Sequence, residues 1–199
     1  MNKLLPILLL ATLPWGRAWA QPLSRSGLDS VRTFRSVERA LKHDGPVYRL
    51  DLSGRKLKAV PEEVRAMKDL NALDLSGNRL RDLPDWLGEL ENMQELRIAR
   101  NKLVEIPKGI CKMRHLKRLD MSRNKIRSMP KCMGKLTELV SLDLWSNDLM
   151  EFPEEIEGMQ ALRFFDLRAI QFEQHEMDRI QELLPKARIF FSQPCNCGM

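Results

Sequence analysis

Residues 73–87 read LDLSGNRLRDLPDWL, and this stretch decides the fold because the chain repeats it. The frame returns every 23 residues, as LRIARNKLVEIPKGI in 96–110, LDMSRNKIRSMPKCM in 119–133 and LDLWSNDLMEFPEEI in 142–156. An earlier copy, LDLSGRKLKAVPEEV, occupies 50–64. Six equivalent apolar residues keep this spacing without slippage: Leu52, Leu75, Ile98, Met121, Leu144 and Leu167. Self-similarity at a period between roughly 20 and 50 residues is the signature of a repeat architecture.

Each position of the repeat has a physical reason. Leu73 and Leu75 alternate with polar residues, so a short strand directs both inward. An asparagine after the strand can hydrogen-bond turn backbone that would otherwise be buried and unpaired, and it recurs as Asn78, Asn101, Asn124 and Asn147. A proline then starts the opposite side of the coil, as Pro61, Pro84, Pro107, Pro130 and Pro153. Since one coil cannot bury its own apolar side, the coils are predicted to stack into a solenoid.

The motif L-x-x-L-x-L-x-x-N-x-L-x-x-L-P-x-x-I-x-x-L resembles the leucine-rich repeat family in its 23-residue form, in particular short exported bacterial members. The resemblance covers Val47 to about Ile170. It implies an α/β solenoid with a parallel sheet on the concave face, irregular, 3-10 or short helical segments on the convex side, and helical caps. It also implies that the concave sheet binds another protein. Most of the methionines occupy apolar positions of this frame, so we interpret them as core residues and not as a cofactor site.

Residues 1–20 have the pattern of a secretory signal peptide. A positive start precedes an apolar stretch over 4–13, and Ala18-Trp19-Ala20 forms a small-x-small cleavage signal before Gln21. The alternative is a buried N-terminal helix, which Pro6 and Pro14 disfavour. The apolar stretch is shorter than the roughly 20 residues that a membrane helix needs. We therefore expect a secreted or periplasmic protein with no transmembrane segment after cleavage.

The remaining chain divides into a linker and cap helix over 21–46, about six repeats over 47–169, and a C-terminal region over 170–199. Caps are expected because the ends of a stack expose its core. The N-terminal helix should carry one apolar face, formed by Phe34, Val37 and Leu41, after a loose polar start. The C-terminal region should contain a helix with Met177, Ile180 and Leu184, a last strand over 189–191 and a cysteine-containing tail.

Catalytic, metal-binding and cofactor-binding residues are not expected. The composition, with 43% hydrophobic and 30% charged residues, is that of a folded chain, but only three histidines are available for acid–base chemistry. His175-Glu176 begins like the zinc motif H-E-x-x-H, yet Arg179 stands where the second histidine is required. Phosphate-loop, dinucleotide and G-x-S-x-G motifs are absent from the sequence. The sequence therefore indicates a protein that is not an enzyme.

Four cysteines in an exported chain allow three disulfide pairings. Cys111 and Cys132 fall on the convex side of adjacent coils and are possible neighbours, but a bridge needs Cα atoms within about 7 Å. Cys195 and Cys197 form a C-x-C that is too sparse for a metal site. These two can remain free thiols, pin the tail or bridge to another chain. The sequence leaves the pairing open.

Arginines and two large aromatics gather at outward positions of the predicted concave face in coils three to six: Arg97, Arg100, Arg118, Arg123, Trp145, Phe164 and Arg168. Trp and Arg are enriched among interface hot spots, and an exposed Trp in a strand serves no folding purpose. We expect this surface to bind a partner protein, whose identity the sequence does not give, with the chain itself a monomer. The alternative is that these residues are chance departures from the repeat consensus on a solvated sheet, and that Phe164 covers the last coil.

A basic stripe along the strand-exit edge favours an alternative function. Its members are Lys56, Arg79, Lys102 and Lys125, with Lys58, Arg81 and Arg127 beside them. Coils lie about 4.8 Å apart, so the stripe is on the order of 15 Å long and can meet a polyanion or an envelope glycan. A solvated edge that keeps the protein soluble is the other interpretation. Nucleic acid is not an expected partner, because the chain is exported and lacks aromatics interleaved with the cations.

The signal-peptide assignment gives a direct prediction. Protein purified from its native host should have the intact mass of a chain that begins at Gln21, because cleavage follows Ala20. A chain that retains Met1 would contradict export.

Overall fold

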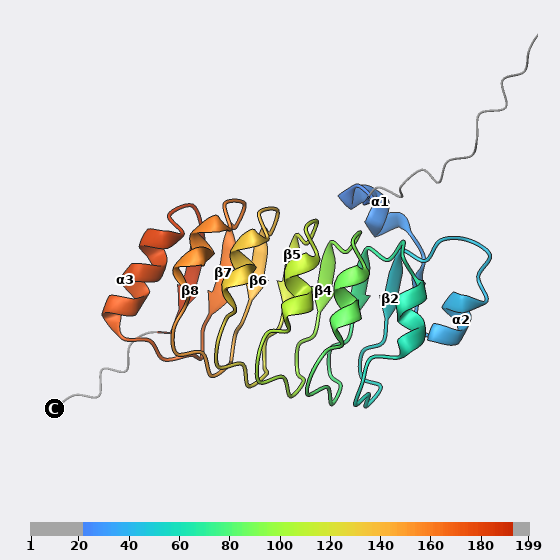
Figure 1. Ribbon diagram of the computed structural model, residues 1–199, viewed down its shortest axis with the longest axis horizontal. Helices are drawn as coiled ribbons and strands as arrows, with labels where there is room; N and C mark the ends of the chain where they lie inside the picture. The colour runs from blue at the N-terminus through green and yellow to red at the C-terminus, as the bar shows by residue number, and fades with distance from the viewer. Residues whose placement is uncertain (1–21, 193–199) are drawn as a thin grey trace, which may run out of the picture.

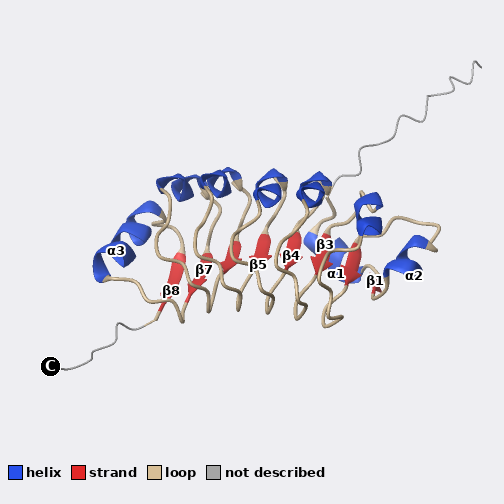
Figure 2. Ribbon diagram, turned by 60° about the horizontal axis from the view of Figure 1, so that its bottom comes forward, coloured by secondary structure: helices blue, strands red, loops and turns tan. Residues whose placement is uncertain are grey.

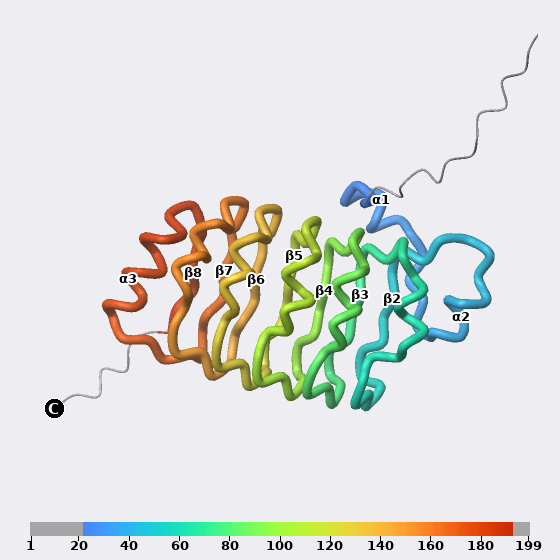
Figure 3. Tube along the Cα trace, in the orientation of Figure 1, coloured from blue at the N-terminus to red at the C-terminus, as the bar shows by residue number. Residues whose placement is uncertain are grey.

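The computed structural model describes residues 22–192, so the signal-peptide prediction for residues 1–20 and the cysteines Cys195 and Cys197 lie outside the described residues. Over this range the strands form one parallel sheet in the order β1-β2-β3-β4-β5-β6-β7-β8. Every strand therefore pairs only with its neighbours in the sequence. Figure 1 shows the coils stacked in one row along the long axis, and the tube in Figure 3 follows the chain from one coil to the next.

The strands are short and share one register. Their bounds are β1 Thr33–Phe34, β2 Arg49–Asp51, β3 Ala72–Asp74, β4 Glu95–Arg97, β5 Arg118–Asp120, β6 Ser141–Asp143, β7 Phe164–Leu167 and β8 Arg188–Phe191. From β2 to β6 the pairing joins equivalent leucines, such as Leu73 with Leu96, and Leu142 then pairs with Phe165. We number the coils one to six by their strands β2 to β7. The register matches the 23-residue frame, and the predicted solenoid with a parallel sheet is confirmed.

The convex side consists of 3-10 helices, one for each of the first five coils: η1 Glu62–Ala66, η2 Asp85–Glu89, η3 Lys108–Lys112, η4 Lys131–Lys135 and η5 Glu154–Gly158. The repeated proline caps each of them at its start. One apolar residue per helix is buried in the core: Val64, Leu87, Ile110, Met133 and Ile156. Figure 2 shows these helices on the outer side of a shallow arch, with the strands inside it.

The methionines of the repeat frame fill the core. Those at apolar positions of the frame are buried with the leucines: Met67, Met93, Met113, Met121, Met129, Met133 and Met159. Their flexible side chains occupy places where the consensus residue is Leu or Ile. The interpretation of these methionines as core residues is confirmed.

The C-terminal end follows its prediction. Helix α3 (Gln174–Leu183) buries Met177 and Ile180, and β8 then pairs with β7 along the sheet edge. No helix among residues 22–192 is both long enough and apolar enough to cross a membrane.

The N-terminal end differs from its prediction, because Phe34 is not on a helix. It lies in strand β1, where it pairs with Leu50. The helix that follows, α2 (Val37–Leu41), has only five residues, and its Leu41 is 51% exposed. A short strand is favoured here because the edge of β2 presents backbone groups that need partners. The segment before β1, expected to be loose, contains the helical turn α1 (Arg25–Ser30), whose Leu28 is buried.

Neighbouring coils are tightly joined on the convex side. Cys111 of η3 and Cys132 of η4 form a disulfide with a Cα–Cα distance of 5.7 Å, which answers the pairing question for these two cysteines. Between η4 and η5 the backbones approach so closely that a Cβ atom at Gly134 would overlap the carbonyl oxygen of Glu155. Glycine is therefore required at this contact.

The asparagine side chains join each strand end to the coil before it. Asn101 donates from Nδ2 to the carbonyl oxygens of Ile98 at 3.1 Å and of Leu75, one coil earlier, at 2.9 Å. Its Oδ1 accepts the backbone N–H of Leu80, also in the preceding coil, at 3.0 Å. We call the repeated set the asparagine ladder: Asn78, Asn101, Asn124 and Asn147. All four are buried, so their amides replace water as the partner of these backbone groups.

Removing one rung should destabilise the stack. Asn124→Ala leaves the carbonyls of Ile98 and Met121 and the N–H of Leu103 without their side-chain partner. We expect the free energy of unfolding, measured by urea titration, to fall by about 1–3 kcal/mol. Lys125→Ala is the matched control, because this neighbouring side chain is exposed, and it should change stability by less than about 0.5 kcal/mol. Equal effects of the two substitutions would contradict the assigned frame.

Candidate functional site

The outward strand positions form parallel rows across the concave face. The strand register places Arg49, Ala72, Glu95, Arg118, Ser141 and Phe164 side by side in one row. The next outward row is acidic except in coil three: Asp51, Asp74, Arg97, Asp120, Asp143 and Asp166. The rows are those expected from the sequence, because alternation along a strand fixes which residues face outward.

The aspartates of the second row have a structural role that the sequence reasoning missed. Each carboxylate accepts the backbone N–H two residues later, as Asp120 does from Ser122 at 3.0 Å and Asp143 from Trp145 at 2.9 Å. The same bond occurs at Asp51, Asp74 and Asp166. The aspartate that recurs near the strand end was the signal for it, since Asp readily hydrogen-bonds its own backbone two residues on.

The acidic row is electrostatically strained around coil five. Burial raises the pKa of the Asp143 carboxyl above its ordinary value, and the neighbouring carboxylates Asp120 and Asp166 raise it further. The hydrogen bond from the Trp145 N–H opposes the shift. The carboxylates of coils four, five and six therefore lie close enough to repel one another, and Arg168 of coil six offsets part of this repulsion at Asp143.

Arg123 and Trp145 form a preassembled pair at the exit of coils four and five. The Arg123 guanidinium lies 4.4 Å from the centroid of the Trp145 ring, within the roughly 6 Å range of a cation–π interaction. Arg123 is exposed and Trp145 is half-buried. The contact limits the rotamers of both side chains before any partner arrives.

Arginines and phenylalanines continue this surface over the last strands. Phe164 is 52% exposed on β7, where it pairs with Arg188 of β8. Arg168 donates to both carboxylate oxygens of Asp166, with an Nη2–Oδ2 distance of 2.6 Å. The guanidinium groups of Arg168 and Arg188 lie 5.7 and 4.9 Å from the Phe190 ring. We call Arg123, Trp145, Phe164, Arg168, Arg188 and Phe190 the carboxy-terminal cluster.

The structure divides the expected binding residues between different surroundings. Arg123, Trp145, Phe164 and Arg168 belong to the carboxy-terminal cluster. Arg118 is instead held by Glu95, with a distance of 3.4 Å between Nη1 and Oε1. Arg188 and Phe190 are functional candidates that the sequence reasoning missed, since the run Ile189-Phe190-Phe191 reads as a cap strand.

Arg100 and Arg123 lie in a tight turn and not on the strand. The backbone has positive φ at one recurring position of each coil: Gly54, Gly77, Arg100, Arg123, Ser146 and Ala169. Coil one has a second such residue, Lys56 of the basic stripe. The glycines of the first two coils were the signal for this turn, because glycine adopts positive φ without a steric cost. A side chain in this conformation costs roughly 1–2 kcal/mol. Arg100 and Arg123 thus occupy a backbone conformation that is unfavourable for residues other than glycine.

The basic stripe is arranged as expected along the strand-exit edge. The backbone N–H groups of Arg79, Lys102 and Lys125 each donate at 2.8 Å to a carbonyl of the preceding coil, so the cations recur once per coil. Lys58, Arg79, Arg81 and Lys102 line a hollow of about 320 Å³ on this edge. Asp148 takes the equivalent place in the next coil and ends the stripe. Over residues 22–192, no three His, Cys, Asp or Glu side chains are grouped closely enough to hold a metal ion.

Comparisons with known proteins agree with this architecture. Two family models match the chain, one described as leucine rich repeat over residues 46–103 and one as leucine-rich repeat region over residues 87–185. None of the curated proteins compared matches it.

Among solved structures, a leucine-rich repeat protein of Leptospira interrogans is 30% identical, with a TM-score of 0.63 over 82% of this chain and 47% of that one. Two internalins of Listeria monocytogenes share the fold. Internalin C2 is 19% identical with a TM-score of 0.64, over 73% of this chain and 62% of that one. InlF is 23% identical with a TM-score of 0.58, over 73% of this chain and 40% of that one. The chain thus spans less than two thirds of the length of each.

The two family models together extend over the same residues as the observed coils, and the repeated leucines, asparagines and prolines occupy equivalent places in each coil. The chain belongs to the leucine-rich repeat family.

Proposed function

We propose that this chain is an exported, non-enzymatic module that binds another protein through the carboxy-terminal cluster of its concave face. The observation that carries the proposal is the Arg123–Trp145 pair, a cation–π contact on an outward surface that contributes nothing to the core. Export is supported by the signal-peptide pattern of residues 1–20. The disulfide Cys111–Cys132 also supports it, because disulfides persist mainly in oxidising compartments.

Three properties of the cluster suit protein recognition. Its aromatic rings offer large contact areas, and Trp and Arg are the residue types most enriched among hot spots. Trp145 is already ordered by Arg123, so binding costs less side-chain entropy. Six coils at about 4.8 Å give a sheet near 25 Å across, which accommodates a standard footprint of roughly 800 Å² per partner.

The charges of the cluster indicate what the partner must present. Arg123 has no carboxylate partner among the ion pairs of the described residues, whereas Arg168 is neutralised by Asp166. A partner that places apolar side chains over Trp145 and over Phe164, and an acidic group near Arg123, would match the aromatic surface and the unpaired charge. Complementary charge of this kind sets specificity and association rate more than affinity.

A second candidate function is binding of a polyanion or an envelope glycan along the basic stripe. The observation in its favour is the hollow between Lys58, Arg79, Arg81 and Lys102, whose lining is entirely cationic. Neighbouring charges of one sign raise the local concentration of a polyanion. Binding there should weaken steeply with salt, whereas binding centred on Trp145 should not.

Alanine at Trp145 should abolish most of the partner binding. Wild-type and Trp145→Ala chains, immobilised in parallel, are exposed to an envelope fraction of the source organism, and captured proteins are identified by mass spectrometry. For a protein retained by the wild type, we expect Trp145→Ala to weaken binding by about 2 kcal/mol or more, as central aromatic hot spots do. The melting temperature should hardly change, because the ring faces away from the core.

Trp86→Ala provides the matched control. Trp86 lies in η2 on the convex side and packs against the core, so its removal should lower stability but leave partner binding unchanged below the melting temperature. Arg123→Gly, which keeps the positive-φ turn, should weaken binding in the same direction as Trp145→Ala. Normal binding by Trp145→Ala, with loss only when Lys102 and Lys125 are neutralised, would assign the function to the basic stripe.

A further inference from the structure

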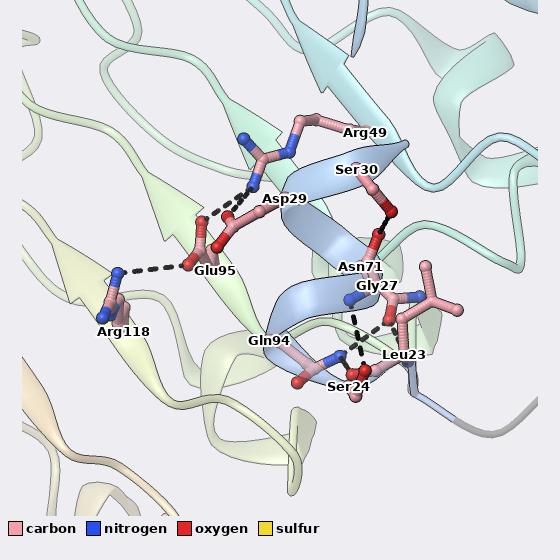
Figure 4. Close-up of polar contacts among 10 residues, drawn as sticks. All are labelled: Leu23, Ser24, Gly27, Asp29, Ser30, Arg49, Asn71, Gln94, Glu95 and Arg118. Atoms are coloured by element: carbon pink, nitrogen blue, oxygen red, sulfur yellow. Dashed lines mark hydrogen bonds and ion pairs between the residues drawn. The ribbon is translucent and has the colours of Figure 1, made fainter. Parts of the chain in front are cut away.

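The residues just before β1 fold back over the repeats instead of covering the end of the stack. We call residues 23–30, which include α1, the amino-terminal strap. Figure 1 places α1 over the body of the solenoid, while α2 lies at its end. In Figure 4 the strap lies beside the strands that carry Arg49 and Glu95, and both Asp29 and Glu95 are directed at the Arg49 side chain. The strap therefore makes contacts that capping does not require.

Two amide side chains hold the backbone of one strap residue. The N–H of Leu23 donates to Oδ1 of Asn71 at 2.7 Å, and Nε2 of Gln94 donates to the carbonyl oxygen of Leu23 at 2.6 Å. Nε2 of Gln94 also donates to Oδ1 of Asn71 at 2.8 Å, which links the two amides. We call Asn71 and Gln94 the amide fork (Figure 4). It pairs with both backbone groups of one residue, as a neighbouring strand would, and so recognises an extended peptide independently of its side chain.

The other ends of the fork are anchored in the repeats. Nδ2 of Asn71 donates to the carbonyl of Asp69 at 2.7 Å, and Oε1 of Gln94 accepts from Nζ of Lys117 at 2.9 Å. Asn71 is 1% and Gln94 3% exposed. Both amides are thus buried with the strap in place, and a peptide that replaces the strap must supply the same backbone partners to avoid leaving them unpaired.

The strap also covers part of the concave face. Leu28 is 2% exposed, yet it lies outside the main cluster of core residues that the repeats form. Ala72 faces outward from β3, yet it is 6% exposed, whereas the other members of its row are half-buried or exposed. A small residue at this place leaves room for a covering segment.

The charged end of the strap fits poorly. Asp29 Oδ1 lies 3.7 Å from Nη2 of Arg49, which is longer than a hydrogen bond. Nε of Arg49 is buried and has no hydrogen-bond partner, the sole side-chain atom of this kind in the described part of the chain. Arg49 also lines a hollow of about 240 Å³, whose other charged residues are Arg35, Arg97, Asp51, Asp74 and Glu95. Nη2 of Arg49 donates to Oε2 of Glu95 at 3.4 Å. A carboxylate that replaced the long contacts of Arg49 with Asp29 and Glu95 could bind Nε and Nη2 together, and such two-point pairing is stronger than a single hydrogen bond.

We propose that the amide fork and Arg49 form a second binding site, for an extended peptide that carries a carboxylate, and that the strap occupies this site until such a peptide displaces it. The strap is thus an internal competitor with an incomplete fit. The inference extends the proposed function to the other end of the concave face, but it uses different residues. Its test involves no outside partner, so it can fail while the proposed function of the Trp145 surface stands.

The test supplies the strap as a separate peptide. An acetylated, fluorescently labelled peptide of residues 22–31, PLSRSGLDSV, is titrated into the full chain and its polarisation is measured. In the wild type the tethered strap competes at an effective concentration on the order of millimolar. Leu28→Asp should release the strap by making its buried leucine charged. We expect the Leu28→Asp chain to bind the peptide at least tenfold more tightly than the wild type.

The fork is tested in the Leu28→Asp background. Gln94→Glu is isosteric and keeps the acceptor for Lys117, but it removes the donor to Leu23, so peptide binding should fall at least tenfold. Gln160→Glu is the matched control, because this exposed amide donates to the Glu157 carbonyl and lies far along the chain from the fork, and it should leave binding unchanged.

Hydrogen exchange of the full chain provides the second readout. Backbone amides of residues 23–30 should exchange at least tenfold faster in Leu28→Asp than in the wild type, while amides of the repeats keep their wild-type rates. Gln94→Met replaces Gln94→Glu if the latter disturbs the repeats. Equal exchange of the strap in both chains would overturn the proposal. So would equal peptide binding by the wild type and Leu28→Asp, or failure of Leu28→Asp to bind the peptide.

Discussion

The hydrogen bonds of the asparagine ladder are the constraint on which the rest of the structure depends. Each buried amide binds backbone groups of its own turn and of the coil before it, so a coil is complete only when its neighbour is present. This fixes the register of the strands, and the register fixes which side chains share the concave face. Trp145 and Arg123 meet because their coils are held at one spacing and in one frame.

Much of the fold could be predicted because periodic positions each need a particular residue type. Asparagine recurs where buried backbone groups need a hydrogen-bond partner. Proline recurs at the start of each convex segment, where a backbone N–H would have no acceptor. Leucine recurs at the strand positions that face the core. The frame also predicted which residues face outward, and therefore most of the carboxy-terminal cluster. The prediction that Phe34 lies on a helix was wrong. Its spacing from Val37 and Leu41 suits a helix, but the open edge of β2 is paired by a strand at this place.

The features that could not be predicted lie outside the period or depend on contacts across it. Leu23 is bound by Gln94, which lies 71 residues away in the sequence, and the 23-residue repeat does not predict a contact of this kind. Asn71 and Gln94 stand 23 residues apart, but other residue types occupy the equivalent positions in other coils, so the pair does not register as a motif. Gly54 and Gly77 indicate the positive-φ turn, because glycine favours that conformation. Coils three and four carry arginine at the same position, and arginine gives no such indication. The two ends of the concave face therefore differ, because the strap covers one end and a partly exposed aromatic surface lies at the other.

The most direct test of the central claim uses the tryptophans themselves. Two of the four lie in residues 1–20, so a chain that begins at Gln21 carries only Trp86 on the convex side and Trp145 on the concave side. Indole N–H resonances of this chain, labelled with nitrogen-15, are followed while the captured partner is added. The account predicts that the Trp145 resonance shifts and the Trp86 resonance does not. A shift confined to Trp86, or saturation of binding with Trp145 unmoved, would contradict recognition through the concave face.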